Sequence, residues 1–349
     1  MAMAEIEVLG GGIFGLSVAY AVARRGAKVR LVDCRRIGTG ASGGLTGALS
    51  PHTPDNWNDK KQFQFESLIA GADYWQEVER LSGLPSGYMQ TGRLVPVNNA
   101  RELDLANERV ASAAEHWRGK ADWQVVRADH FPGWGPQSTT GYLVHDTLTA
   151  RIDPRRAIAC LAAAIRASGG EIIEGGTARG ADQTVICTGY EGLLDLSREF
   201  GCEVGKGVKG QSLLLQHDAR DMPQIFSDGV FLIPHQDGTL AIGSTSENEW
   251  VDPASTDDKL EILYQKAMQV MPSLKSANLL CRWAGVRPRG QKRAPILGRH
   301  PSRPGVFIAN GGFKIGFGVA IGVGEAMADL VVDGKNQIPK AFSVEANLT

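Results

Sequence analysis

The chain has 349 residues, enough for two folding units at about 150 residues per domain. Acidic and basic residues nearly cancel to a net charge of −1, which excludes a strongly basic surface for nucleic acid or anionic membranes and favours small-molecule partners. Five scattered cysteines and dispersed histidines show no metal-ligand spacing, so we expect free thiols in a reducing compartment, no disulfide and no metal site.

The first residues, MAMAEIEVLGGG, carry two acids and no basic segment before an apolar stretch. A signal peptide has the opposite pattern, so the sequence indicates a cytoplasmic protein. The longest mostly apolar run, residues 315–332, contains Glu325, Asp329 and several glycines. It falls short of the about 20 apolar residues that a membrane span requires, and we predict none.

The first predicted elements are a strand at 6–9, a helix at 13–25 and a strand at 29–32, with Gly26 as the helix stop. This order is a βαβ unit of about 30 residues. Three glycines within it have the G-x-G-x-x-G spacing, and an acid follows the second strand: Gly10, Gly12, Gly15 and Asp33.

Each of these residues has a physical role in binding a dinucleotide. Gly10 permits a tight turn, Gly12 lets backbone N–H groups reach a pyrophosphate, and Gly15 lets the helix pack closely on the strand. Asp33 is placed to bind a ribose hydroxyl. In this strand, turn, helix and strand context we predict dinucleotide binding over a merely glycine-rich turn.

Further along the chain, apolar positions over 62–82 predict a helical core face, residues 91–97 a strand, 153–170 a helix capped by Asp153, and 171–176 and 181–189 two strands. A second pattern of elements follows, unlike the βαβ unit at the start. Turn-separated strands at 211–217, 229–235 and 238–244 indicate an antiparallel sheet, before a helix at 257–271 and a strand in 305–312.

Because the βαβ pattern and the antiparallel pattern alternate along the chain, we expect interleaved domains. The predicted fold class is α/β with an α+β second domain: a Rossmann-like dinucleotide-binding domain interleaved with an antiparallel-sheet substrate domain. The expected ranges are 1–55, 146–198 and 286–349 for the first domain, and 56–145 and 199–285 for the second.

The fingerprint alone does not separate NAD from FAD. Over nearly its whole length, however, the sequence resembles the D-amino-acid oxidase superfamily of FAD-dependent oxidoreductases, and within it glycine oxidase and sarcosine-oxidase-like enzymes. The resemblance rests on GGGIFGLSVAYAVARRGAKVRLVD, ASGGLTGALSP, IDPRRAIACL, ADQTVICTG and FLIPHQDGTLAIGST, and above all on RWAGVRPRGQKRAPILGRHP followed by VFIANGGFKIGFGVAIGVGEAMADLVVDG.

The resemblance implies bound FAD, held without a covalent bond because no cysteine follows GVRP where sarcosine oxidases attach the flavin. Ser42 to Thr46 would line the pyrophosphate and ribityl chain, Gly47 to Leu49 would pass beside the flavin ring, and Thr188 and Gly189 would contact the ADP half. The full set of implied cofactor-binding residues is Gly10, Gly12, Ile13, Phe14, Gly15, Asp33, Cys34, Arg35, Ser42, Gly43, Thr46, Gly47, Leu49, Thr188, Gly189, Gly312, Phe313, Lys314, Ile315 and Gly316.

The implied catalytic residues are Arg287, Lys314, Phe231 and Ala48. Arg287, in GVRP, matches the arginine that holds the substrate carboxylate in this family. Lys314, in GGFKIGFG, matches a second cation near the ring, and the following helix would point its positive end at the flavin. A solvent-facing lysine at a helix start is the alternative, and the glycine context favours function.

Two departures from the family remain open. Phe231 aligns with a position that is often tyrosine in glycine oxidase, and a place in the sheet core is the equal alternative. The basic residues Arg289, Lys292 and Arg293 are either a solvated loop, which the pattern favours, or a pocket for a second carboxylate such as that of iminodiacetate.

The activity that the resemblance implies is oxidation of a small carboxylate-bearing amine, with hydride transfer to flavin N5, an imine hydrolysed to an oxo acid, and reoxidation by O2 or another acceptor. The substrate classes are glycine, sarcosine, iminodiacetate or a D-amino acid, and a homo-oligomer is possible. The alternatives are an FAD-dependent 2-hydroxy-acid dehydrogenase, a nicotinamide dehydrogenase and a flavoprotein that serves only as a binding module.

Overall fold

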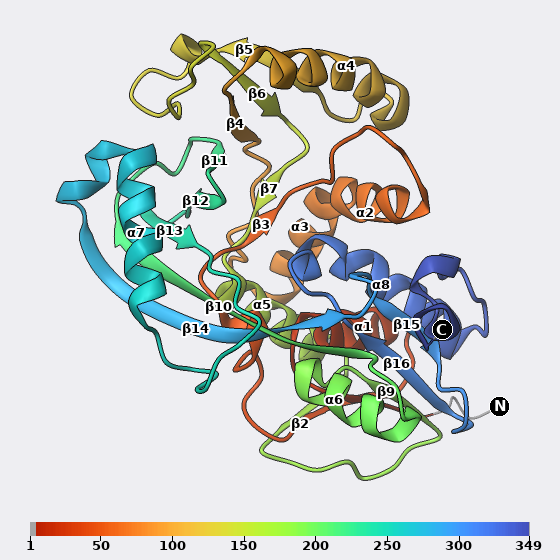
Figure 1. Ribbon diagram of the computed structural model, residues 1–349. Helices are drawn as coiled ribbons and strands as arrows, with labels where there is room; N and C mark the ends of the chain where they lie inside the picture. Colours follow the sequence, from red (N-terminus) through yellow and green to blue (C-terminus); the bar gives the residue numbers. More distant parts are fainter. Residues whose placement is uncertain (1–4, 349) are drawn as a thin grey trace.

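The computed structural model describes residues 5–348, which form two large β-sheets, a two-stranded ribbon and the helices packed on them (Figure 1). Residues 1–4 and 349 lie outside the described part, so the extreme N-terminal residues used above to judge targeting are not covered. Within residues 5–348, no helix is both long enough and apolar enough to cross a membrane.

The first sheet has six strands in the order β15-β16-β9-β1-β2-β8. All neighbours are parallel except the antiparallel pair of β15 and β16. The strands are β1 (Ile6–Leu9), β2 (Val29–Asp33), β8 (Glu171–Glu174), β9 (Gln183–Ile186), β15 (Ile296–Arg299) and β16 (Val306–Asn310). No strand is present between β8 and β9, over residues 175–182.

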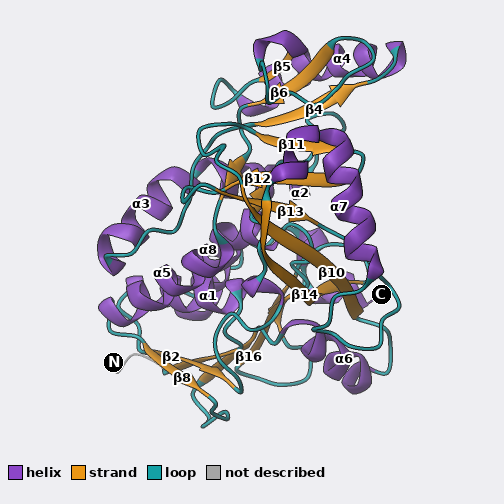
Figure 2. Ribbon diagram, turned by 90° about the vertical axis from the view of Figure 1, so that its left-hand side faces the viewer, coloured by secondary structure: helices purple, strands orange, loops and turns teal. Residues whose placement is uncertain are grey.

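Helices cover both faces of this sheet, as its nearly continuous apolar strands require. Along β16, Phe307 and Ala309 face one core and Ile308 faces another. Figure 2 shows α1 (Ile13–Arg24), α5 (Pro154–Ala167) and α8 (Gly316–Val332) on one face. On the other face, α6 (Gly189–Phe200) and α9 (Val344–Leu348) pack against Ile308.

The second sheet has eight strands in the order β14-β10-β13-β12-β11-β4-β6-β5. All neighbours are antiparallel except β4 and β11. The strands are β4 (Arg93–Val97), β5 (Trp123–Arg127), β6 (Tyr142–Asp146), β10 (Gly205–Gln216), β11 (Gln224–Ser227), β12 (Val230–Pro234), β13 (Thr239–Gly243) and β14 (Asn278–Gly290). A two-stranded ribbon, β3 (Ala48–Leu49) and β7 (Ala150–Arg151), links the layers.

Alternation along β13 shows what each face of the second sheet packs against. Leu240 and Ile242 are buried with helix α7 (Asp258–Val270), whereas Ala241 clusters with Leu45 from the loop after β2. Since successive residues of a strand point to opposite faces, one face packs on α7 and the other faces the dinucleotide-type layer.

The helical stretch predicted over 62–82 is wrong as a single helix. It is divided into α2 (Asp59–Ile69) and α3 (Gly71–Ser82), with Ala70 between them. The break lets α2 pack on α8 while α3 packs on α5. The prediction also missed α4 (Ala100–Trp117), which lies against β5, and the short 3-10 turns η1 (Ala41–Gly43), η2 (Ala128–His130), η3 (Pro272–Ser276) and η4 (Lys340–Phe342).

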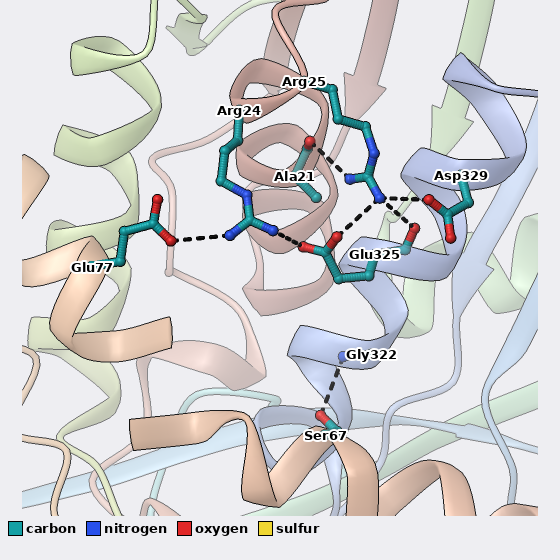
Figure 3. A network of polar contacts seen from close by, with 8 residues as sticks. All are labelled: Ala21, Arg24, Arg25, Ser67, Glu77, Gly322, Glu325 and Asp329. Atoms are coloured by element: carbon teal, nitrogen blue, oxygen red, sulfur yellow. Dashed lines mark hydrogen bonds and ion pairs between the residues drawn. The ribbon is translucent and has the colours of Figure 1, made fainter. Parts of the chain in front are cut away.

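Arginines at the end of α1 join three helices (Figure 3). Arg24 donates to Glu77 of α3 at 3.0 Å and to Glu325 of α8 at 2.7 Å. Arg25 donates to Glu325 at 2.9 Å and to Asp329 at 2.6 Å. These contacts fix α1 and α8 against each other, and the N-termini of both helices open toward the candidate site.

The predicted fold class is confirmed, because a parallel dinucleotide-type sheet and a mostly antiparallel second sheet alternate along the chain. The division into the five ranges given above stays a prediction. Its boundary at residue 286 falls inside β14, which continues from the second sheet toward the first layer.

Candidate functional site

A cavity of about 860 Å³ lies at the carboxyl ends of the parallel strands and extends to the second sheet. The carboxyl ends of parallel strands are where open α/β sheets bind ligands. One end of the cavity is lined by the turn after β1, the loop after β2 and the start of α6. The other end is lined by β12, β13, β14 and the segment before α8.

The glycines of the first turn are packed too closely for side chains. Gly10 has φ +107, and a Cβ there would lie 2.4 Å from the carbonyl oxygen of Cys187. A Cβ on Gly15 would lie 1.9 Å from the carbonyl oxygen of Gly10. Gly12 is the N-cap of α1 without a side-chain cap, so the positive end of α1 opens into the cavity.

Two polar side chains brace this turn. Ser42 Oγ accepts a hydrogen bond from the N–H of Ile13 at 3.0 Å. Asp33 accepts from the N–H groups of Gly11 at 2.6 Å and Arg35 at 2.8 Å. Each carboxylate oxygen has a second acceptor site, so Asp33 keeps capacity for a ribose hydroxyl.

The far wall of this end comes from α6. Thr188 and Gly189 line it, and Asn310 of β16 donates to the carbonyl oxygen of Gly189 at 2.9 Å. Arg35 lies opposite and pairs with Glu191 of α6 at 2.7 Å. This ion pair joins the loop after β2 to the start of α6.

The other end of the cavity holds a guanidinium without a carboxylate partner in hydrogen-bond range among residues 5–348. Arg287 donates to Ser244 Oγ at 2.6 Å and to the carbonyl oxygen of Thr245 at 3.2 Å. Burial lowers the pKa of Arg287 to about 10, partly offset by the charge of Glu247, so the side chain stays cationic at neutral pH. Glu247 is itself paired with Lys259 at 3.0 Å.

Lys314 is brought beside Arg287 by backbone pairing. The N–H of Phe313 donates to the carbonyl oxygen of Pro288 at 2.9 Å, and Gly312 forms an isolated bridge with Arg289. Partial desolvation, and then the charge of Arg287, lower the pKa of Lys314. Two cations therefore share this end of the cavity, and the Lys314 side chain is solvent-exposed.

The cavity lining contains all four residues predicted as catalytic. Of the predicted cofactor residues, four do not line it: Gly15, Gly43, Leu49 and Ile315. Gly15 and Gly43 instead allow tight backbone packing, since a Cβ on Gly43 would lie 2.0 Å from the carbonyl oxygen of Gly38. Leu49 is buried in the main core, and Ile315 is the N-cap of α8. The roles of the others stay predictions.

The basic cluster near Arg287 lies apart from the cavity lining. Lys292 and Arg293 are exposed, and Lys292 donates to the carbonyl oxygen of Ala346 at 2.6 Å. Arg289 reaches Asn248 at 3.4 Å. This arrangement favours a solvated loop over a pocket for a second carboxylate.

Several lining residues were missed, among them Ser244, Phe226, Asn310 and Trp283. The period of two along a strand would have placed Trp283 on the same face as Arg287. Ser244 and Asn310 carry no local signal, because their partners are 43 and 121 residues away in sequence.

The sequence matches the family described as FAD dependent oxidoreductase over residues 5–330. The match covers most of the chain, and the protein belongs to this family of FAD-dependent oxidoreductases. It is similar to glycine oxidase of Pseudomonas putida, with 26% identity over 99% of each chain.

Two further similarities bear on chain length and fold. The bifunctional protein ThiO/ThiG of Nostoc sp. is 25% identical over 95% of this chain, which spans only 53% of that protein's length. The crystal structure of iminodiacetate oxidase from Chelativorans sp. has a TM-score of 0.85 at 21% identity, covering 97% of this chain and 98% of that one. At that identity the likeness supports the fold.

The cavity fits FAD, the cofactor of this family. The N-terminus of α1 points in, its N-cap Gly12 has no side chain, and Ser42 Oγ bonds only the N–H of Ile13, which suits an anionic pyrophosphate. A Cβ on Gly316 would meet no protein atom closer than 3.7 Å, so this glycine leaves room toward a ligand, whereas a Cβ on Gly12 would crowd Ser42 Oγ at 3.3 Å. Within residues 5–348, no group of His, Cys, Asp or Glu could hold a metal.

Proposed function

We propose that the protein oxidises the C–N bond of a small amine that carries a carboxylate. The substrate class comprises glycine, N-substituted glycines such as sarcosine or iminodiacetate, and D-amino acids. The products would be an oxo acid, such as glyoxylate, and ammonia or an amine, with H2O2 formed where O2 is the acceptor. The observation that carries this proposal is the half-buried Arg287 guanidinium, which faces the cavity beside Lys314 and has no ion-pair partner among residues 5–348.

The dinucleotide end would hold FAD without a covalent bond. The turn of Gly10 and Gly12 and the start of α1 would bind the pyrophosphate, Ser42 and Thr46 would line the chain leading to the ring, and Thr188 would contact the ADP half. The chemistry that bound FAD would supply is removal of a hydride from the substrate carbon next to the amine, leaving an iminium that water hydrolyses.

Arg287 would anchor the substrate carboxylate with its fork of N–H donors, and Ser244 and Thr245 would fix the guanidinium's orientation. Lys314 would add a second positive charge at the same end. Two neighbouring cations disfavour a protonated amine, because like charges lower the pKa of the amine group. The substrate would therefore bind with the neutral nitrogen that oxidation requires.

Among the described lining residues, the same end of the cavity offers no carboxylate or histidine as a general base. The carboxylates in the described lining, Asp33, Glu191 and Asp195, all belong to β2 and α6, at the dinucleotide end, and the lining contains no histidine. Oxidation of a 2-hydroxy acid needs a base for the hydroxyl proton, whereas a neutral amine needs none. This contrast favours the amine over the hydroxy acid.

The test is anaerobic bleaching of the holoenzyme's flavin by glycine, sarcosine, iminodiacetate, proline and D-amino acids, repeated with Arg287→Met. We expect the variant to lose about 100-fold or more in kcat/KM, because several charge-assisted hydrogen bonds are removed. Arg282→Met, on the same strand but paired with Glu261 at the surface, is the matched control. Unchanged turnover in Arg287→Met would overturn the proposal, and product analysis for ammonia or amine separates it from hydroxy-acid oxidation.

A further inference from the structure

The tip of a β-hairpin places an aromatic pair at the substrate end of the cavity. Strands β11 and β12 are joined through Asp228 and Gly229, which have φ values of +48 and +77, as a tight two-residue hairpin turn requires. Phe226 and Phe231 are directly opposite each other in this hairpin. Their ring centroids are 4.5 Å apart, both side chains are half-buried, and both line the cavity.

The strand register puts this pair in the same row as a third aromatic residue. Phe231 is opposite Gly243 of β13, Gly243 is opposite Ser212 of β10, and Ser212 is opposite Trp283 of β14. Directly opposite residues of antiparallel strands point to one face of the sheet. On the face toward the cavity, this row therefore begins with Phe231 and ends with Trp283.

Glycines let the carboxylate anchor lie between these aromatic groups. Gly210 of β10 and Gly285 of β14 are directly opposite each other. A Cβ on Gly210 would lie 2.0 Å from the Nη1 of Arg287, and a Cβ on Gly285 would lie 2.4 Å from the ring of Trp283. The guanidinium and the indole thus cover adjacent positions, and the guanidinium reaches across to Ser244, next to Gly243.

The wall around this anchor is apolar. Ile233 of β12 lines the cavity beside Phe231, and Ala48 lies close by in the same small core cluster. Strands β11 to β14 contribute no carboxylate or amide side chain to the described lining. A charged or amide group of a substrate placed against this wall would lose its hydration without gaining a hydrogen-bond partner.

Resting on the function proposed above, we infer that the preferred substrate carries a flat apolar group, such as a benzyl group, on its nitrogen or α-carbon. Phe226 and Phe231 would bind that group while Arg287 holds the carboxylate. Burial of an aromatic ring against the pair favours such substrates over glycine. A second carboxylate, as in iminodiacetate, would find only Lys314 to pair with.

The kinetic test compares kcat/KM of the holoenzyme for N-benzylglycine, D-phenylalanine, glycine and iminodiacetate. We expect one of the two benzyl compounds to exceed glycine and iminodiacetate by about tenfold to 100-fold. The position of the benzyl group in the better substrate tells whether the group enters on nitrogen or on carbon. Higher kcat/KM for glycine or iminodiacetate than for both benzyl compounds would overturn the inference.

The variants Phe226→Ala and Phe231→Ala test the aromatic pair itself. Each should lower the preference for the benzyl substrate over glycine by about tenfold, whereas Phe231→Tyr, which keeps the ring, should retain most of it. Phe200→Ala is the matched control, because Phe200 is also half-buried but packs on His300 away from the cavity. An unchanged preference in both alanine variants contradicts the assignment.

A binding experiment separates this inference from the proposed function. The affinity of the holoenzyme for phenylacetate, acetate and malonate is measured by calorimetry, without any turnover. We expect phenylacetate to bind about tenfold or more tightly than acetate, and Phe231→Ala to reduce that ratio. If no amine reduces the flavin but phenylacetate still binds best, the proposed reaction fails and the apolar subsite stands. If amines are oxidised but malonate binds best, the function stands and the subsite fails.

Discussion

The two ends of the cavity are lined by different kinds of chemical group. At the dinucleotide end, backbone groups and close-packed glycines from one continuous βαβ unit form the wall. At the substrate end, long side chains from separate strands reach over glycines, and no carboxylate of the described residues lies in hydrogen-bond range of the Arg287 guanidinium. The first end is set by the path of the chain, and the second by the pairing of β10, β13 and β14, so substitutions should act differently at each.

The largest effect is expected from Gly15→Ala at the dinucleotide end. The new Cβ would lie 1.9 Å from a backbone oxygen, so the turn after β1 must move, at a cost of about 3 kcal/mol in unfolding free energy. Thermal unfolding of the apoprotein and the FAD content of purified protein measure this. Gly318→Ala in α8, where a Cβ meets nothing closer than 3.5 Å, is the control and should retain both.

At the substrate end, Gly210→Ala should leave the fold and FAD content intact but displace Arg287. The three protein atoms nearest its Cβ all belong to the guanidinium of Arg287, with Nη1 closest at 2.0 Å. We expect carboxylate affinity to fall by about tenfold to 100-fold, because the guanidinium loses its fixed position. Titration of the holoenzyme with acetate measures it. Loss of FAD from this variant would show that the two ends are not independent.

Carboxylate binding should weaken as the pH rises and Lys314 loses its charge. The pKa of Lys314 is lowered by burial and by Arg287, and a lysine binds an anion only in its protonated form, below its pKa. Affinity should therefore be full below that lowered pKa and fall by about threefold to tenfold as the pH rises through it. In Lys314→Arg the fall should shift to higher pH. The same profile in wild type and in Lys314→Met would remove Lys314 from the binding site.

The smallest effect is expected from Arg25→Met, which cuts the contacts of α1 with Glu325 and Asp329 shown in Figure 3. Because the ion pairs are partly exposed, we expect a loss of about 1 kcal/mol in unfolding stability. Helix α1 lies at the dinucleotide end and α8 at the substrate end, and these contacts join the two helices. If FAD content falls, carboxylate affinity should therefore fall with it. Chemical denaturation with parallel ligand titrations checks this.

The sequence predicted those parts of the molecule that local patterns determine. The glycine turn, Asp33 and the capped helix α5 follow from short-range rules, and the structure places them where expected. The break at Ala70 was missed, because α2 and α3 pack on different helices that come much later in the chain. Propensity alone does not encode such a tertiary demand.

The substrate end was predicted only in part. Arg287 and Lys314 were found through family resemblance, and the structure brings them together through the bond between Phe313 and Pro288. Gly210 and Ser244 were not predicted. They lie beside Arg287 only because of the register between strands, and they are 77 and 43 residues from it along the chain. Such long-range pairing leaves no periodic signal in either strand.

The strand order of the six-stranded sheet has a consequence for biosynthesis. Its members β1 and β2, β8 and β9, and β15 and β16 come from three distant stretches, and β9 pairs with both β1 and β16. A nascent chain leaving the ribosome cannot finish this sheet until Asn310 has emerged, and until then β9 presents an open edge. Such late closure slows folding and exposes the growing chain to aggregation, so its passage to the native state should depend on chaperones.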